Sequence, residues 1–175
     1  MLVMNSKKIT LSAMFLAIGI ILPFVTMNIP VIGKMLLPMH IPVILAGFII
    51  GPVYGALLGV LTPLVRSFMF GVPYFYPNAV SMAFELMVYG LVSGIMYHLL
   101  FKKNNKIISI YISLITSMLL GRIVYGIVKV VMGIIASSSF TFSMFISYSL
   151  LNALPGIILQ LILIPILIKY LKIRD

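Results

Sequence analysis

Long apolar stretches constrain this chain more than any other feature. The 175 residues are 63% hydrophobic and only 8% charged, whereas about a quarter of a soluble domain is charged. Continuous runs of Leu, Ile, Val and Met approach the ~20 residues that a helix needs to cross a bilayer, and they favour helices over a barrel. The sequence therefore predicts an all-α integral membrane protein, with residues 1–175 forming a single domain.

Six transmembrane helices are expected, and Gly51-Pro52 is a strong break between the second and the third. The apolar N-terminal segment has no Ala-x-Ala cleavage site, so we expect it to be retained as the first helix. The predicted ranges are Ile9–Met27, Met39–Gly51, Pro52–Phe70, Asn78–Phe101, Lys106–Ile134 and Ser143–Leu171.

Basic residues set the orientation of the predicted bundle. With six spans, three basic clusters fall on one side, and only Lys34 lies on the other; with five spans the clusters would be divided. Because cytoplasmic loops carry an excess of Lys and Arg, six spans with both termini in the cytoplasm is the better reading. The net charge of +10 then reflects topology rather than nucleic-acid binding. The clusters are Lys7/Lys8, Lys102–Lys106 and Lys169/Lys172/Arg174.

Four charged residues interrupt the apolar stretches: Arg66, Glu85, Arg122 and Lys129. A charge in the bilayer costs at least ~2.5–3.5 kcal/mol and usually marks a functional site. We expect Glu85 to pair with one of the cations, which leaves two for an anionic or carboxylate-bearing ligand. In the alternative, Arg66 and Lys129 reach the outer interface and Glu85–Arg122 is a purely structural pair.

Helix direction places these groups, with His40 and Asn152, in the outer half of the bundle. Arg122, Tyr125 and Lys129 share one helix face, which should point inward. The loop Gly71–Pro77 is aromatic and rich in proline, and it either covers the site or anchors the chain at the interface.

Small residues form a second pattern. Gly47, Gly51, Gly55 and Gly59 recur every four residues, and internal bundle packing is the favoured interpretation. The chain has no cysteine, no phosphate-binding Gly-x-x-x-x-Gly-Lys-[Ser/Thr] loop and no His-Glu-x-x-His motif. We therefore expect no enzyme activity, no catalytic residues, no metal and no cofactor.

An ordered set of motifs resembles the S components of energy-coupling-factor (ECF) vitamin transporters. The set comprises Ala13-x-x-x-Ala17, the run from Leu37 to Ala56 (Leu-Pro-Met-His-Ile-Pro-Val-Ile-Leu-Ala-Gly-Phe-Ile-Ile-Gly-Pro-Val-Tyr-Gly-Ala), Ala83-Phe-Glu-Leu-Met-Val-Tyr-Gly-Leu-Val-Ser-Gly94, Gly121-Arg-Ile-Val-Tyr-Gly126 and Asn152-Ala-Leu-Pro-Gly156.

This resemblance implies a multi-pass, substrate-binding subunit in the cell membrane of a bacterium, which works with a transmembrane coupling subunit and two cytoplasmic ATPases. It implies that Ala13 and Ala17 contact the coupling subunit. It also implies a substrate site near the outer face, built from the loop 28–38 and from the helices that carry Glu85, Arg122, Tyr125, Lys129 and Asn152.

The resemblance is greatest to pantothenate-type S components, and a carboxylate suits the surplus of cations. Hydroxymethylpyrimidine, cobalamin and a queuosine precursor stay open as alternative substrates. Two other hypotheses are an autonomous homodimeric transporter and a scaffold whose charges only lock the bundle.

Overall fold

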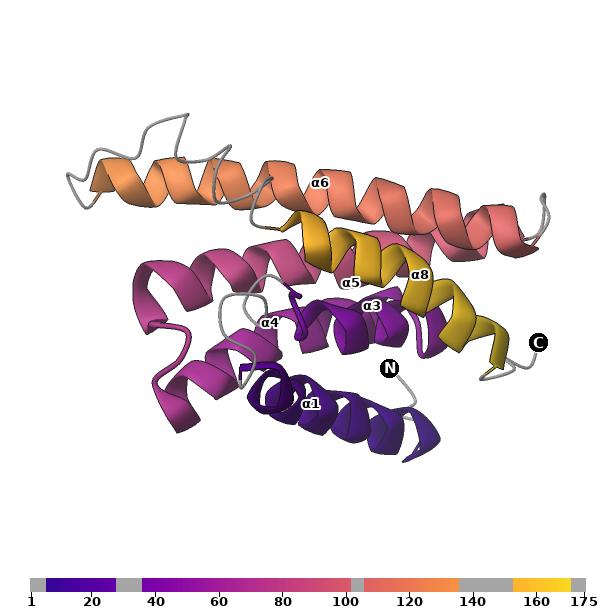
Figure 1. Ribbon diagram of the computed structural model, residues 1–175, viewed down its shortest axis with the longest axis horizontal. Helices are drawn as coiled ribbons and strands as arrows, with labels where there is room; N and C mark the ends of the chain where they lie inside the picture. The colour runs from indigo at the N-terminus through magenta and orange to yellow at the C-terminus, as the bar shows by residue number, and fades with distance from the viewer. Residues whose placement is uncertain (1–5, 28–35, 102–105, 136–152, 171–175) are drawn as a thin grey trace.

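The computed structural model describes residues 6–27, 36–101, 106–135 and 153–170, and all regular secondary structure in this part of the chain is helical (Figure 1). The predicted all-α fold with six helices is confirmed. The helices are α1 (Ser6–Met27), α3 (His40–Ile49), α4 (Pro52–Phe70), α5 (Val80–Phe101), α6 (Lys106–Ile135) and α8 (Leu154–Tyr170), and the π-helical turn η1 (Phe75–Ala79) precedes α5.

The described helices fall into two length classes. Four segments are long and apolar enough to cross a membrane: Ser6–Thr26, Pro52–Phe70, Phe75–Leu100 and Lys106–Ile134. In contrast, α3 has 10 residues and α8 has 17. At 1.5 Å per residue, α3 reaches only about 15 Å, roughly half of the hydrocarbon core. The residues 143–152 of the last predicted helix lie outside the described part.

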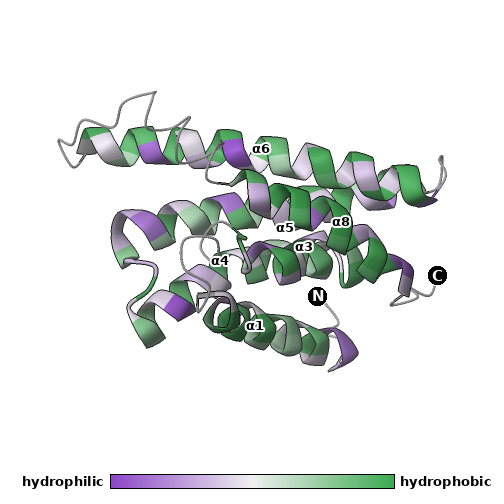
Figure 2. Ribbon diagram, in the orientation of Figure 1, coloured by the Kyte–Doolittle hydropathy of each residue, from purple (hydrophilic) through white to green (hydrophobic). Residues whose placement is uncertain are grey.

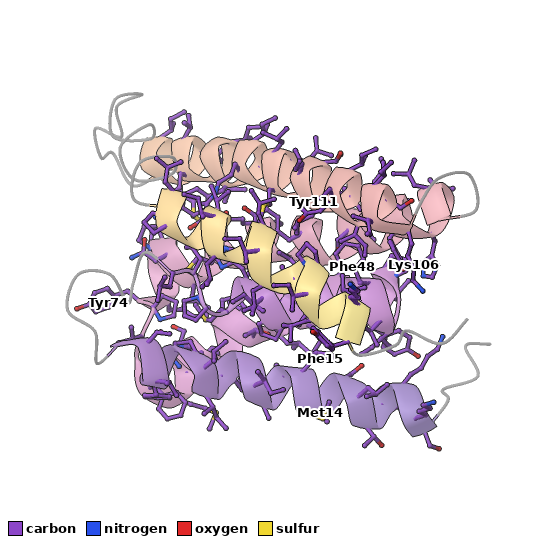
Figure 3. All side chains as sticks on the ribbon, turned by 45° about the vertical axis from the view of Figure 1, so that its right-hand side comes forward. Met14, Phe15, Phe48, Tyr74, Lys106 and Tyr111 are labelled. Atoms are coloured by element: carbon purple, nitrogen blue, oxygen red, sulfur yellow. The ribbon has the colours of Figure 1, made fainter. Side chains whose placement is uncertain are left out.

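The helix ends that carry basic residues lie together at one end of the bundle. The Ser6 end of α1, the Lys106 end of α6 and the Tyr170 end of α8 lie together at the right of Figure 1, and the turn between α4 and α5 lies at the left. Lys106 and Tyr74 accordingly occupy opposite ends in Figure 3. The basic residues near the described chain ends therefore share one side of the bundle, as the orientation argument requires.

Two glycines end helices where the backbone must turn. Gly51 has φ 126°, a conformation that glycine adopts readily, and it separates α3 from α4 at the predicted Gly-Pro break. Gly71 has φ 68° and ends α4, with its N–H donating to the Ser67 carbonyl at 2.9 Å. The second turn redirects the chain into η1 and α5.

The central helices pack with almost no space between their backbones. A Cβ atom at Gly59 would meet the Leu86 carbonyl of α5, and one at Gly90 would meet the Gly55 carbonyl of α4. Gly47 of α3 faces the Gly90 carbonyl in the same way. Gly47, Gly55 and Gly59 therefore serve internal packing among α3, α4 and α5, as small-residue contacts in membranes permit. Gly51 does not share this role, because a Cβ atom there would meet nothing within 4 Å.

The remaining helices surround this unit. Helix α5 lies between α4 and α6, whereas α1 packs on α3 and α4, and α8 contacts α6 and α3 (Figure 1). Helix α6 presents an exposed apolar stripe to the outside, comprising Ile115, Leu119, Ile123 and Ile127. Figure 2 shows that hydrophilic bands interrupt α4, α5 and α6 mainly in the half of the bundle away from the basic ends.

Candidate functional site

A cavity of about 460 Å³ lies at the end of the bundle opposite the basic termini. Its volume falls within the range of typical small-molecule sites. The lining is mostly apolar and aromatic and comes from α1, the start of α3, the end of α4, the turn into α5, and α6. The lining residues are Pro23, Thr26, Pro38, Met39, Arg66, Val72, Pro73, Tyr74, Asn78, Met82 and Tyr125.

Arg66 is a buried cation in the wall of this cavity. Its side chain is 2% exposed, and Nη1 donates to the Ile20 carbonyl of α1. Its guanidinium carbon lies 4.4 Å from the centre of the Phe24 ring. A stacked guanidinium keeps its charge while contacting apolar surface, so Arg66 makes this wall positively charged. This burial favours the predicted inward placement of Arg66 over the alternative in which it reaches out to the interface.

Lys129 lies at the margin of the cavity and is held across the bundle. Its Nζ donates to the Asn78 side-chain oxygen at 2.6 Å and lies 5.6 Å from the centre of the Tyr125 ring. Both Asn78 and Tyr125 line the cavity. The predicted shared face of Arg122, Tyr125 and Lys129 is confirmed, because Arg122 is buried and the other two are partly buried.

Glu85 pairs with Arg122, in agreement with the prediction that it pairs with one of the cations. Arg122 Nη1 lies 3.0 Å from Glu85 Oε1, and His40 Nε2 lies 3.7 Å from Glu85 Oε2. Tyr89 completes this group, with its ring centre 5.2 Å from that of His40. We call these four residues the polar cluster; all are at most 8% exposed.

The predicted site residues thus occupy three places. Arg66 and Tyr125 line the cavity, and Lys129 contacts its margin. His40, Glu85 and Arg122 are absent from the lining and form the polar cluster deeper in the described bundle. Asn152 lies outside the described residues, so its predicted contact with substrate stays a prediction.

Two residues of this region were missing from the predicted site. Tyr89 is four residues after Glu85 on α5, and that spacing places both on one helix face, which was a usable signal. Asn78 was taken only as a helix start. Its role depends on the distance to Lys129, 51 residues along the chain, and no local pattern encodes such a pairing.

Ala13 and Ala17 lie on the outward face of α1. Both are exposed, whereas Phe15 and Gly19 of the same helix are buried. Figure 3 shows the corresponding division, with Met14 pointing away from the bundle and Phe15 toward it. Among the described residues, no group of three His, Cys, Asp or Glu side chains is placed to hold a metal ion.

Apolar spans around a partly buried, cation-lined cavity define a membrane-embedded small-molecule binding protein. Residues 7–168 match the family model described as "ECF transporter, substrate-specific component". The chain belongs to this family. It is therefore a multi-pass component of a prokaryotic cell membrane and a transport protein rather than an enzyme, and membership implies an ECF coupling subunit and ATPases as partners.

The chain is also similar to a protein whose name gives a substrate. The chain is 31% identical over 169 residues to a "Probable tryptophan transport protein" of Clostridium perfringens (strain 13 / Type A), an alignment that covers 89% of this chain and 90% of the relative. No solved structure matches the chain significantly.

Proposed function

We propose that this chain is the S component of an importer for tryptophan or a closely related aromatic amino acid. The observation that carries the proposal is the cavity itself, in which aromatic and apolar side chains surround a buried arginine. The name of the Clostridium perfringens relative, a probable tryptophan transport protein, points to the same ligand. Neither comparison names pantothenate or another vitamin, so the predicted vitamin remains only an alternative.

The chemistry of the lining suits an aromatic carboxylate. Tyr74 and Tyr125 offer ring faces, and Met82 offers a flexible, polarisable contact for an indole or phenyl ring. None of the described lining residues is acidic, and Glu85 and Asp175 are the only acids in the whole chain. With Arg66 in the wall and Lys129 beside it, the cavity favours a ligand that carries negative charge.

Pantothenate also carries a carboxylate, but it has no ring to use the aromatic lining. Hydroxymethylpyrimidine has a ring but no carboxylate. The aromatic lining favours hydroxymethylpyrimidine over pantothenate, and the positive charge of the wall favours pantothenate over hydroxymethylpyrimidine. Only an aromatic carboxylate uses both features.

Ligand fluorescence tests this proposal directly. The chain contains no tryptophan residue, so indole emission from a purified sample comes from the ligand alone. We expect saturable binding of tryptophan by the isolated protein, with a shift of emission to shorter wavelength as the indole leaves water. A tenfold excess of pantothenate should displace little of it; complete displacement by pantothenate would contradict the proposal.

Transport by the isolated chain separates this proposal from the autonomous transporter. An S component reconstituted alone into liposomes should bind tryptophan without accumulating it. Accumulation driven by an ion gradient, in the absence of any ATPase, would support the autonomous transporter instead.

A further inference from the structure

The polar cluster has more hydrogen-bonding capacity than the described protein uses. His40, Glu85 and Arg122 come from three different helices, α3, α5 and α6, and meet in the interior. Five of their buried atoms have no hydrogen-bond partner among the described residues. These atoms are His40 Nδ1 and Nε2, Glu85 Oε1, and Arg122 Nε and Nη2.

The ion pair itself is incomplete. Arg122 Nη1 and Glu85 Oε1 are 3.0 Å apart but are not aligned as a hydrogen bond. The remaining Arg122 donors, Nε and Nη2, lie on the edge of the guanidinium that can bind a carboxylate through two parallel bonds. Glu85 in turn can accept hydrogen bonds from an ammonium group. The cluster thus offers one acceptor and one two-pronged donor side by side.

This cluster lies within about one helical turn of residues that line the cavity. Three lining residues are its near neighbours in the chain: Met39 precedes His40, Met82 lies one turn before Glu85, and Tyr125 lies one turn after Arg122. Three residues of helix correspond to about 4.5 Å along the axis. Met39 and Met82 have flexible side chains that can change rotamer, so we infer that their movement connects the cavity with the cluster.

We propose that the polar cluster reads the head group of an α-amino acid. The carboxylate binds Arg122, the ammonium group binds Glu85, and His40 donates or accepts the remaining hydrogen bond, while the aromatic side chain occupies the cavity above. Without ligand, Glu85 and Arg122 neutralise each other; the zwitterion then adds one negative charge at the free edge of Arg122 and one positive charge at Glu85, so the buried charges stay balanced. This inference rests on the proposed function and deepens it.

Discrimination follows from the cost of a bare charge in a buried site. A ligand with a carboxylate but no ammonium group would place a second buried negative charge beside Glu85 with no cation to balance it. A ligand with only an ammonium group would place a second buried positive charge beside Arg122. An uncompensated buried charge is strongly unfavourable, so both analogues should bind much more weakly than the amino acid.

The first test uses the unmodified protein and therefore does not depend on the folding of a variant. Tryptophan, indole-3-propionate (which lacks the ammonium group) and tryptamine (which lacks the carboxylate) are compared by equilibrium binding. We expect each analogue to bind roughly 100-fold or more weakly than tryptophan. Indole-3-propionate binding as tightly as tryptophan would overturn the head-group inference and leave the proposed aromatic-carboxylate function standing.

The same comparison can also reject the proposed tryptophan function while leaving the head-group inference intact. If tryptophan fails to bind but another L-amino acid binds and loses affinity on removal of either charged group, the head-group inference stands and the proposed tryptophan function fails. If no amino acid binds, the head-group inference is overturned.

A variant assigns the ammonium contact to its residue. Glu85→Gln keeps the approximate shape of the side chain but removes its charge. It should weaken tryptophan by at least about 30-fold and should strengthen indole-3-propionate, because the buried negative charge that disfavours this ligand is gone. Lys169→Gln, an exposed change in the last turn of α8, is the matched control and should alter neither. Equal losses for both ligands in Glu85→Gln, or none for either, would overturn the assignment.

Discussion

At the residue scale, the molecule uses its few buried charges in two different ways. Arg66 is stabilised by a backbone carbonyl and an aromatic ring, whereas Arg122 is neutralised by Glu85. The first arrangement leaves a net positive charge beside the cavity, and the second creates a neutral pair beneath it. Equal burial therefore has different electrostatic consequences at the two arginines.

Arg66 gives a prediction at this scale. Arg66→Gln removes the positive charge from the cavity wall and should weaken tryptophan binding about 10-fold, because the wall no longer attracts the carboxylate that Arg122 binds. The neutral ligand indole should lose much less affinity. Binding isotherms for both ligands test this, and equal losses would show that Arg66 only supports the shape of the cavity.

At the element scale, the turn between α4 and α5 is fastened to α6 by side chains. The Tyr76 hydroxyl donates to the Met132 carbonyl at 3.1 Å, and Lys129 donates to Asn78 at 2.6 Å. The same turn supplies Val72, Pro73 and Tyr74 to the cavity lining. This arrangement favours the predicted covering role of the aromatic loop, although Tyr74 is also exposed, as an interfacial anchor would be.

Loosening this attachment should speed ligand release. The double variant Tyr76→Phe/Asn78→Ala removes both hydrogen bonds, each of which contributes about 1 kcal/mol. We expect the dissociation rate of tryptophan, measured by stopped-flow fluorescence, to rise about 10-fold. Tyr111→Phe, a change at a partly exposed tyrosine elsewhere on α6, serves as the control; an unchanged rate in the double variant would mean that the turn does not retain the ligand.

The glycine contacts between α4 and α5 give a second prediction for the elements. Gly59→Val places a side chain against the Leu86 carbonyl, where backbone cannot easily yield, and should destabilise the protein by at least about 2 kcal/mol. Leu57→Val, on the exposed face of the same helix, should have little effect. Thermal unfolding in detergent measures both, and equal melting temperatures would contradict the packing account.

The sequence predicted the bounds of the helices better than the side-chain contacts between them. Apolar length and the Gly51-Pro52 break located α4 well, and the expected Lys106–Ile134 helix differs from α6 by one residue at its end. Helix direction also predicted that the charges gather in one half. It could not predict that Arg66 turns toward α1 or that Asn78 holds Lys129, because both contacts depend on how neighbouring helices rotate about their axes.

At the scale of the whole molecule, the two sides of α1 have separate roles. Its buried face, including Phe15 and Gly19, packs on α3 and α4, and its exposed face carries Ala13 and Ala17. Small exposed residues allow another helix to approach closely. We propose that this face contacts the coupling subunit, away from the polar cluster.

Bulky substitutions on this face should separate partner binding from ligand binding. Ala13→Leu/Ala17→Leu should abolish co-purification with the coupling subunit and abolish uptake, while tryptophan affinity changes less than about threefold. Leu119→Phe, on the exposed stripe of α6, is the control and should preserve both. Retention of the coupling subunit by the alanine variant would refute the assignment of this face.

The central claim is that the isolated chain captures one aromatic amino acid in its outer cavity. Native mass spectrometry of protein purified from tryptophan-replete cells tests it most directly, because the carried small molecule is identified without prior choice of ligand. We predict one bound tryptophan per chain, absent from the Arg66→Gln variant. A bound pantothenate, or a chain that carries no small molecule and takes up no added tryptophan, would contradict the account.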